Sequence, residues 1–349
     1  MNWILYGANG YTGRLIAREA VARGLRPRLA GRNAAALAAI GAELGLPWEA
    51  FSLEPADALR KAIRGSRLVL HCAGPFSETA APMLAACLAE GVHYLDITGE
   101  IDVFEQAFKL DEAARRADVV LAPGVGFDVV PSDCLAARLV EALPAATYLQ
   151  LAFEAGGGPS PGTAKTSVEG LARGGWVRRD GQLKRVPLAW RTRTVPFAHG
   201  ERHAVTIPWG DLFTAWVSTG VPDIEVYMAV SPSTSARLRR LRWLQPLLAT
   251  GPMQAFMKRQ VEKRVRGPDA GRREASESQL WGEAGSADGR RVTATMTTPN
   301  GYELTVTAAL GVVEHLLVQD TEGGYYTPSL LMGSDYAESL RGVRFSRVS

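Results

Sequence analysis

The sequence predicts an α/β protein: a doubly wound parallel sheet comes first, and a second α/β domain with a mixed, mainly antiparallel sheet follows. Over the first third, six short apolar runs alternate with five stretches of helical periodicity, which favours an open parallel sheet with helices between its strands. Beyond Pro131 the pattern changes to strands joined by turns. The 349 residues suffice for two cores, since single cores stop growing near ~250–300 residues.

The elements expected in the first domain alternate regularly along the chain. Each strand is a short apolar run, and the runs are 3–7, 26–31, 48–53, 67–74, 92–98 and 118–124. The helices have apolar residues at helical spacing, and we expect them at 12–23, 34–44, 56–63, 78–90 and 102–116. Asn33 stands where the second helix needs an N-cap.

The second half has a less regular pattern. "RRDGQ" and "SADGRR" are typical of hairpin turns, at 178–182 and 286–291. We expect helices at 131–143, 302–317 and 328–340, a basic helical segment at 234–266, and extended segments at 146–158, 211–219, 223–230 and 274–298.

Three glycines recur at every third position in "YGANGYTG", residues 6–13, directly after the first strand. Gly7 lets the strand turn sharply, Gly10 lets the backbone approach a pyrophosphate, and Gly13 lets the helix pack against the strand. The amides that follow would face the phosphates at the positive end of the helix. The motif therefore predicts a Rossmann-type dinucleotide site, formed by Gly7, Asn9, Gly10, Tyr11, Thr12 and Gly13.

The end of the second strand distinguishes the two nicotinamide cofactors. NAD sites usually place an acidic residue there to hold the ribose 2′-hydroxyl, but this chain reads Ala30-Gly31-Arg32-Asn33. Arg32 can bind a 2′-phosphate through its planar fork, so the sequence predicts NADP(H) as the cofactor. Asn33 is either a further contact or only the helix cap.

A second loop follows the fourth strand in "HCAGPF", residues 71–76. We expect it to pass under the nicotinamide half of the cofactor, with contacts from Cys72, Ala73, Gly74, Pro75 and Phe76. Together with other stretches it makes the chain resemble the saccharopine dehydrogenase-like oxidoreductases, in particular short bacterial members related to trans-acting enoyl reductases. The stretches are "GANGYTG", "AGRN", "AGPF", "YLDITGE", "GFDVVPSD", "SPGTAKTS", "NGYELT" and "GYYTPSLLMG".

The resemblance implies a Rossmann domain at 1–130, a substrate and dimerisation domain at 131–318, and a C-terminal segment, 319–349, that returns to the Rossmann domain. It also implies reduction of a C=C or C=N bond, or the reverse reaction. The family often has an acidic residue near the adenine after the third strand, where this chain has Ser52 and Leu53.

Three side chains are candidates for catalysis. Glu100 follows the fifth strand, at the edge where doubly wound sheets bind ligands, but it could also cap or charge the first turn of the next helix. Asp128 lies in "GFDVVPSD", where the chain crosses between domains, and Asp133 in the same stretch is expected to be structural. Lys165 in "SPGTAKTS" could donate a proton or lie on the surface, and Thr163 or Thr166 could cap the helix that follows.

Composition excludes several function classes. A net charge of +3 is too small to indicate nucleic-acid binding. Three cysteines without a Cys-x-x-Cys spacing favour neither a disulfide framework nor a zinc site, and the five histidines do not cluster, so we expect no metal. We see no signal peptide and no uncharged apolar run of ~18 residues, so we expect a cytoplasmic protein.

Basic residues gather in "RLRRLRWLQPLL", residues 237–248, opposite leucines at helical spacing. This segment could contact an anionic membrane surface or an acyl carrier, or be an ordinary amphipathic helix. The sequence thus indicates an NADP(H)-dependent oxidoreductase acting on a small molecule, with a lipid-like or acyl compound as the candidate substrate. The alternatives are a non-catalytic NADP(H) sensor and a membrane-surface protein; a homodimer is compatible with each.

Overall fold

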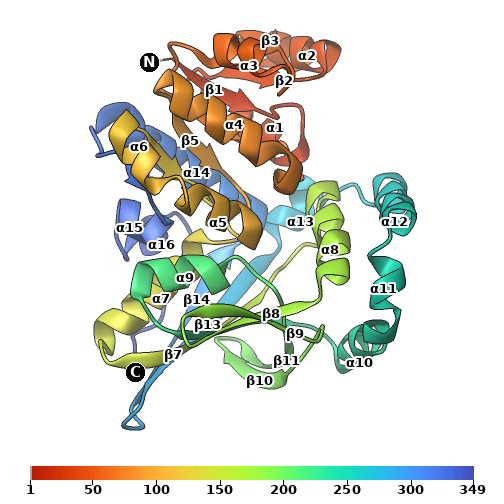
Figure 1. Cartoon of the computed structure of the whole chain (residues 1–349), viewed down its shortest axis with the longest axis vertical. Coiled ribbons are helices and arrows are strands. Elements are labelled where there is room, and N and C mark those ends of the chain that lie inside the picture. Colours follow the sequence, from red (N-terminus) through yellow and green to blue (C-terminus); the bar gives the residue numbers. More distant parts are fainter. Residues whose placement is uncertain (1) are drawn as a thin grey trace. The chain divides into compact units, whose positions relative to one another are not determined.

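The computed structural model describes residues 2–349, apart from the side chain of Glu262. The chain forms two compact units. The first contains the residues up to Val130 together with Leu304–Met332, and the second contains Pro131–Glu303 and Gly333–Ser349. Figure 1 shows that helix α14 (Gly301–Val318), near the C-terminus, lies among the elements of the N-terminal unit.

The first unit is built on a seven-stranded sheet in the order β15-β6-β5-β4-β1-β2-β3. All of its strand pairs are parallel. The strands are β1 (Trp3–Tyr6), β2 (Arg28–Gly31), β3 (Trp48–Ala50), β4 (Leu68–His71), β5 (His93–Asp96), β6 (Val120–Ala122) and β15 (Gly324–Tyr325). The order reverses between β1 and β4, which is where doubly wound sheets bind ligands.

Six helices connect the first six strands. They are α1 (Tyr11–Ala22), α2 (Ala34–Leu44), α3 (Ala56–Ile63), α4 (Phe76–Glu90), α5 (Ile101–Phe108) and α6 (Asp111–Ala117). Asn33 caps α2 as expected, since its side chain accepts a hydrogen bond from the Ala36 amide at 3.0 Å. The single helix expected at 102–116 is two helices, because the chain leaves helical geometry at Leu110.

Helix α14 completes the core of the first unit. Ten of its residues are buried, among them Leu304, Leu310 and Leu316. Within the described residues it is the one helix whose length and hydropathy would allow it to cross a membrane, but 56% of that window is buried inside the protein. Its burial identifies it as a core helix.

The second unit contains a nine-stranded sheet whose main path is β10-β11-β12-β7-β13-β14-β16; β8 pairs with β12, and β9 pairs with β8. Only the β12–β7 pair is parallel, so the sheet is mixed and mainly antiparallel, as predicted. The strands are β7 (Ala146–Glu154), β8 (Gly175–Arg179), β9 (Gln182–Val186), β10 (Thr192–Phe197), β11 (Gly200–Thr206), β12 (Asp223–Ala229), β13 (Glu277–Ser286), β14 (Arg291–Pro299) and β16 (Arg344–Phe345).

Helices flank this second sheet. Leu135 and Leu139 of α7 pack so closely on β13 that only Gly282 leaves room for them, because a Cβ there would lie 2.6 Å from Leu139. The helices of the unit are α7 (Val130–Ala142), α8 (Pro161–Arg173), α9 (Asp211–Thr219), α10 (Pro232–Leu241), α11 (Gln245–Leu248), α12 (Gly251–Arg264), α13 (Ala270–Glu274) and α16 (Tyr336–Ser339). Helix α15 (Pro328–Met332) belongs to the first unit.

The structure corrects several further expectations from the sequence. Residues 211–219 form a helix instead of a strand. The helix expected at 328–340 is two short helices, and the basic segment at 234–266 is broken into α10, a 3₁₀ turn, α11 and α12. The first unit takes in the chain from Leu304 to Met332, whereas 319–349 was the range expected to return to it; β16 pairs with β14 instead.

Candidate cofactor site

The glycine turn after β1 has the geometry that a close phosphate contact needs. Gly7 has φ +84°, which favours glycine, and its amide donates to the Ala30 carbonyl at 2.8 Å. A Cβ on Gly7 would lie 2.7 Å from the Ala73 amide nitrogen. The turn is therefore packed directly against the loop that follows β4.

Helix α1 begins under this turn. A Cβ on Gly13 would lie only 2.3 Å from the Gly7 carbonyl oxygen, so no other residue fits there without a shift of the backbone. Gly10, the N-cap, is exposed and supplies no side chain to hydrogen-bond the first-turn amides. The positive end of the helix dipole therefore carries no side-chain cap at Gly10.

The neighbouring helix N-termini are occupied from within the chain. Asn33 caps α2, and both oxygens of Glu100 accept hydrogen bonds from the first turn of α4: from Phe76 N at 3.0 Å and from Ser77 N at 2.9 Å. Helix α1, by contrast, has a glycine, Gly10, at its N-cap. A dinucleotide phosphate is best accommodated at α1.

Arg32 stands at the end of β2 as the sequence analysis expected. It is exposed, and the described part of the chain provides it with no ion pair. Its positive charge lowers the pKa of the nearby Tyr6 hydroxyl, although burial raises that pKa by more. Asn9 lies beside the same strand end, since its side-chain oxygen is the atom nearest to a Cβ built on Gly31. Arg32 is thus available to an anionic group.

The loop after β3 is held close to the glycine turn. The Tyr6 hydroxyl donates to the Phe51 carbonyl at 3.3 Å, and the two rings lie 5.3 Å apart. The Ser52 hydroxyl accepts from the Glu54 amide at 3.4 Å. Ser52 and Leu53 therefore lie beside the end of β1, where an adenine contact was expected.

The loop Cys72–Phe76 continues β4 past the sheet edge. Cys72 N donates to the Tyr6 carbonyl, and the Gly74–Pro75 peptide is cis. Burial raises the pKa of the Cys72 thiol, so it stays protonated. The Thr79 hydroxyl holds the loop by hydrogen bonds to the Ala73 and Pro75 carbonyls, at 2.7 and 3.0 Å.

His71, the last residue of β4, supports this loop through Thr79. It is fully buried, and burial lowers its pKa to about 3, so the ring is neutral. Its Nε2 lies 3.0 Å from the Thr79 hydroxyl, whose proton is engaged by the loop carbonyls. His71 is a packed, partnered residue, and it keeps the loop in place.

Glu100 is 5% exposed, and its side chain caps α4 instead of the helix that it precedes, α5. The geometry favours a positioning role: Glu100 fixes the start of α4 beside the Cys72–Phe76 loop. Its role as an acid remains a prediction.

Asp96, which the sequence analysis did not single out, organises the adjacent loops. It is fully buried at the end of β5, and its carboxylate accepts hydrogen bonds from Tyr94 Oη at 2.6 Å, Thr98 N at 3.0 Å and Gly124 N at 2.8 Å. Burial raises its pKa to about 6 despite these bonds. The sequence feature that could have pointed to Asp96 is its place as an acidic residue at the end of an apolar strand.

Asp128 lies in the same unit, next to Gly99. A Cβ on Gly99 would come within 3.1 Å of the Asp128 carboxylate, so the Asp128 side chain packs directly on the Gly99 backbone. Burial, and secondly the negative charge of Glu100, raise the pKa of Asp128 to about 7. Asp128 can therefore hold a proton near neutral pH, as a general acid must.

Lys165 lies in the second unit, on α8. The cap of α8 is neither Thr163 nor Thr166: the Ser160 hydroxyl accepts from Thr163 N at 3.3 Å. Ser160 in turn donates its amide to the Tyr302 hydroxyl, so "SPGTAKTS" and "NGYELT" meet in space. Lys165 is partly buried, and its role as a proton donor stays a prediction.

Asn300, at the start of "NGYELT", is fixed by buried hydrogen bonds. It is fully buried, and its amide nitrogen donates to Gly156 O at 3.0 Å and to Ser276 Oγ at 2.8 Å.

Asp133 is also fully buried. Its carboxylate accepts a hydrogen bond from the Ser218 hydroxyl at 2.7 Å, which agrees with the structural role expected for it.

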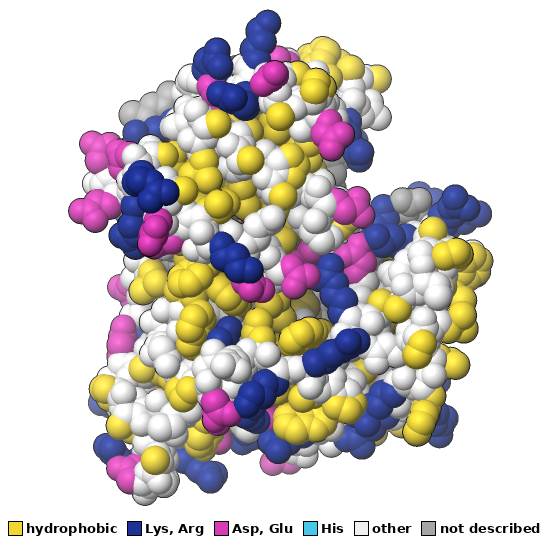
Figure 2. All heavy atoms as spheres, in the orientation of Figure 1, with side chains coloured by type: hydrophobic (Ala, Val, Ile, Leu, Met, Phe, Trp, Pro, Cys, Tyr) yellow, Lys and Arg dark blue, Asp and Glu magenta, His cyan; other side chains and the backbone are white. Residues whose placement is uncertain are grey.

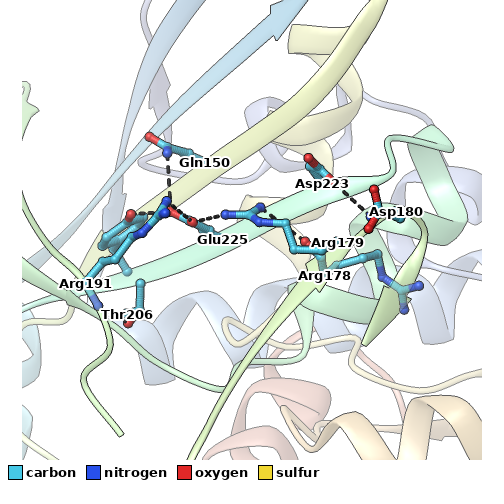
Figure 3. A network of polar contacts seen from close by, with 9 residues as sticks. Gln150, Arg178, Arg179, Asp180, Arg191, Thr206, Asp223 and Glu225 are labelled. Atoms are coloured by element: carbon cyan, nitrogen blue, oxygen red, sulfur yellow. Dashed lines mark hydrogen bonds and ion pairs between the residues drawn. The ribbon is translucent and has the colours of Figure 1, made fainter. Parts of the chain in front are cut away.

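Two hollows of the second unit have distinct linings. One, of about 820 Å³, lies against α10 and α11 and is lined mainly by arginine and Trp243; Figure 2 shows basic and hydrophobic side chains intermixed along that edge. The other, of about 620 Å³, lies on β7 and β12. There the buried Glu225 already binds Arg179 and Arg191 (Figure 3), so these charges hold the sheet together.

Comparison with known proteins now gives these features a context. Residues 3–121 match the family model described as the saccharopine dehydrogenase NADP binding domain. That range contains the glycine turn, Arg32, the Cys72–Phe76 loop and Glu100. The family model is named for an NADP-binding domain, which agrees with the cofactor that the sequence predicts.

Individual relatives of this NADP-binding domain agree. A trans-acting enoyl reductase of Mycobacterium leprae is 36% identical over 140 residues, which is 37% of this chain and 33% of the relative. A probable mitochondrial saccharopine dehydrogenase-like oxidoreductase of Arabidopsis thaliana is 29% identical over 152 residues, 37% of this chain and 32% of the relative. The match spans about a third of the length of these relatives.

The likeness in fold extends beyond the NADP-binding domain. The structure of apo saccharopine dehydrogenase (L-Glu forming) from Saccharomyces cerevisiae has a TM-score of 0.65, with 99% of this chain and all of that chain covered, at 11% identity. The chain therefore has the saccharopine dehydrogenase-like fold in both units.

Proposed function

We propose that the protein is an NADP(H)-dependent oxidoreductase that reduces a C=C or C=N bond of a small molecule, with a lipid-like or acyl substrate as the leading class. The observation that carries this proposal is the combination of the Gly7–Gly13 turn at the start of α1 and an unpaired Arg32 in a segment that matches an NADP-binding domain. The enoyl reductase relatives support the bond type.

The residues of this chain have separable roles in such a reaction. The Gly7–Gly13 turn and the first turn of α1 would bind the pyrophosphate, and Arg32 the 2′-phosphate. The bound cofactor would supply the hydride. Glu100 keeps the Cys72–Phe76 loop in position through its bonds to α4.

Reduction of a double bond also needs a proton on the second atom. Asp128 is the better donor, since its pKa of about 7 leaves part of it neutral at physiological pH, whereas both oxygens of Glu100 are engaged by amides. Lys165 is the runner-up. The three free thiols suit a reducing cytoplasm, where we place the reaction.

The test is a turnover assay with NADPH and a panel of enoyl and imine compounds of increasing acyl length. We expect loss of the reduced-nicotinamide absorbance that requires both protein and substrate, and a product heavier by two hydrogens. Tight NADPH binding without turnover of any compound would contradict the proposed enzymatic activity and favour the alternative, a non-catalytic NADP(H) sensor.

A further inference from the structure

Hydrophobic side chains protrude from one segment of the second unit. Eight large hydrophobic residues are exposed in the described part of the chain, and four of them lie between residues 243 and 256. Trp243 is 87% exposed, Leu244 50%, Leu247 52% and Phe256 57%. Trp243 and Leu247 are one helical turn apart, and Figure 2 shows hydrophobic side chains along the edge formed by α11 and α12. Such a concentration marks an interaction surface.

The chain in and around this segment is strongly basic. Residues 232–266 contain nine Lys and Arg and one acidic residue, a net charge of +8. The whole chain is only +3, so the rest carries −5. The near-neutral total therefore conceals a strong local asymmetry.

The arginines beside Trp243 are not neutralised by acids. Arg239 and Arg242 donate to the carbonyls of Leu188 and Ala189, which hold the guanidinium groups in place but leave their charge uncompensated. Burial, and secondly the charge of Arg239, lowers the pKa of Arg242. Arg237 and Arg240 have no acidic partner among the described residues.

These arginines line a hollow. It has a volume of about 820 Å³, and its lining contains no acidic residue: Arg185, Val186, Pro187, Arg239, Arg240, Arg242, Trp243 and Gln245. An anionic head group fits such a hollow, next to an aromatic side chain at the boundary of water and hydrocarbon.

The charges and shape favour a membrane over other partners. A twofold interface with a second copy would place two +8 segments against each other, which is repulsive. A nucleic acid would offer no hydrocarbon to Leu244 and Leu247. Side chains that protrude, instead of lining an apolar groove, suit insertion at a lipid surface.

We propose that residues 237–256 dock the protein on an anionic membrane surface. Trp243, Leu244 and Leu247 insert at the level of the head groups, Arg237 and Arg240 bind lipid phosphates, and Phe256 extends the apolar contact. The inference stands on the second unit alone and does not depend on the cofactor site.

The experiment is flotation of the full-length protein with vesicles of phosphatidylcholine alone or with about 30% phosphatidylserine. We expect binding only to the anionic vesicles at ~0.1 M salt, and its loss at ~0.5 M salt, because surface charges are then screened. Arg240→Glu and Trp243→Ala should each weaken binding at least about tenfold. Lys61→Glu, which makes the same charge change at an exposed position of the other unit, is the control for Arg240→Glu. Leu247→Ala should also weaken binding, and its control is Leu330→Ala, at an equally exposed leucine of the other unit.

Three results would overturn the proposal: no binding to the anionic vesicles, equal binding to neutral vesicles, or binding unchanged in both Arg240→Glu and Trp243→Ala. Circular dichroism checks that each variant is folded. If a second copy covers the segment instead, sedimentation will show a dimer that Trp243→Ala dissociates, and the wild-type protein will not float with vesicles.

Discussion

At the scale of the residue, two neighbouring carboxylates of the first unit differ in what surrounds them. Glu100 is held by two backbone amides, while Asp128 lies where burial and the charge of Glu100 favour its neutral form. Environments that separate two carboxylates in this way are typical of acid–base pairs. We propose that Glu100 has a positioning role and that Asp128 donates the proton.

The raised pKa of Asp128 predicts a pH-dependent stability. Between pH ~4 and ~7 the folded chain binds more protons at this position than the unfolded chain, so the free energy of unfolding falls as pH rises. Asp128→Asn removes this loss. Relative to wild type, the variant should gain about 1–3 kcal/mol between pH ~5 and ~8, measured by urea unfolding.

The control for this comparison is Asp102→Asn, at an exposed carboxylate on α5, which should show no such gain. Unfolding curves of Asp128→Asn and wild type that shift in parallel with pH would contradict the assignment.

At the scale of the element, the glycine turn and α1 form one unit whose glycines have different tasks. Gly13 is needed for packing, since a Cβ would lie 2.3 Å from a backbone oxygen, whereas a Cβ on the exposed Gly10 would be 3.2 Å from the same oxygen. Gly10 is therefore the position at which a side chain would obstruct a ligand with little harm to the fold.

Two substitutions separate these tasks. Gly13→Ala should destabilise the protein by about 2–4 kcal/mol, as overpacking does, with Gly170→Ala as a control in open space. Gly10→Val should keep the thermal midpoint within a few degrees yet reduce affinity for NADPH and NADH alike by at least about tenfold. A stable Gly10→Val protein with unchanged affinity would mean that the pyrophosphate lies elsewhere.

The sequence allowed prediction of elements where local signals agree with the tertiary structure. The glycine turn, the Asn33 cap and the two hairpins are set by short-range chemistry. Residues 211–219 were mispredicted because their β-branched and aromatic residues favour a strand. Burial against the second sheet made them a helix, and Gly220, with φ +72°, ends it as a left-handed cap.

At the scale of the whole molecule, the two units draw on distant parts of the chain. The order of the parallel sheet follows from alternating strands and helices, but nothing local indicates that β15 pairs with β6 or that α14 packs from Leu304 in the first unit. Such pairings depend on which surfaces remain uncovered. For the same reason the role of Asn300 and the cap that Glu100 provides to α4 escaped prediction.

The central claim, a site built for NADP(H), is tested most directly by calorimetric titration of the purified protein and of Arg32→Asp with NADPH and then NADH. We expect wild type to bind NADPH much more tightly. Arg32→Asp should weaken NADPH about 30–100-fold and change NADH by less than about threefold, because one charge-assisted bond to phosphate is lost and repulsion is added. Arg18→Asp, at an exposed position of α1, should change the affinity for neither cofactor. Equal wild-type affinity for the two cofactors, or no binding of either, would contradict the account.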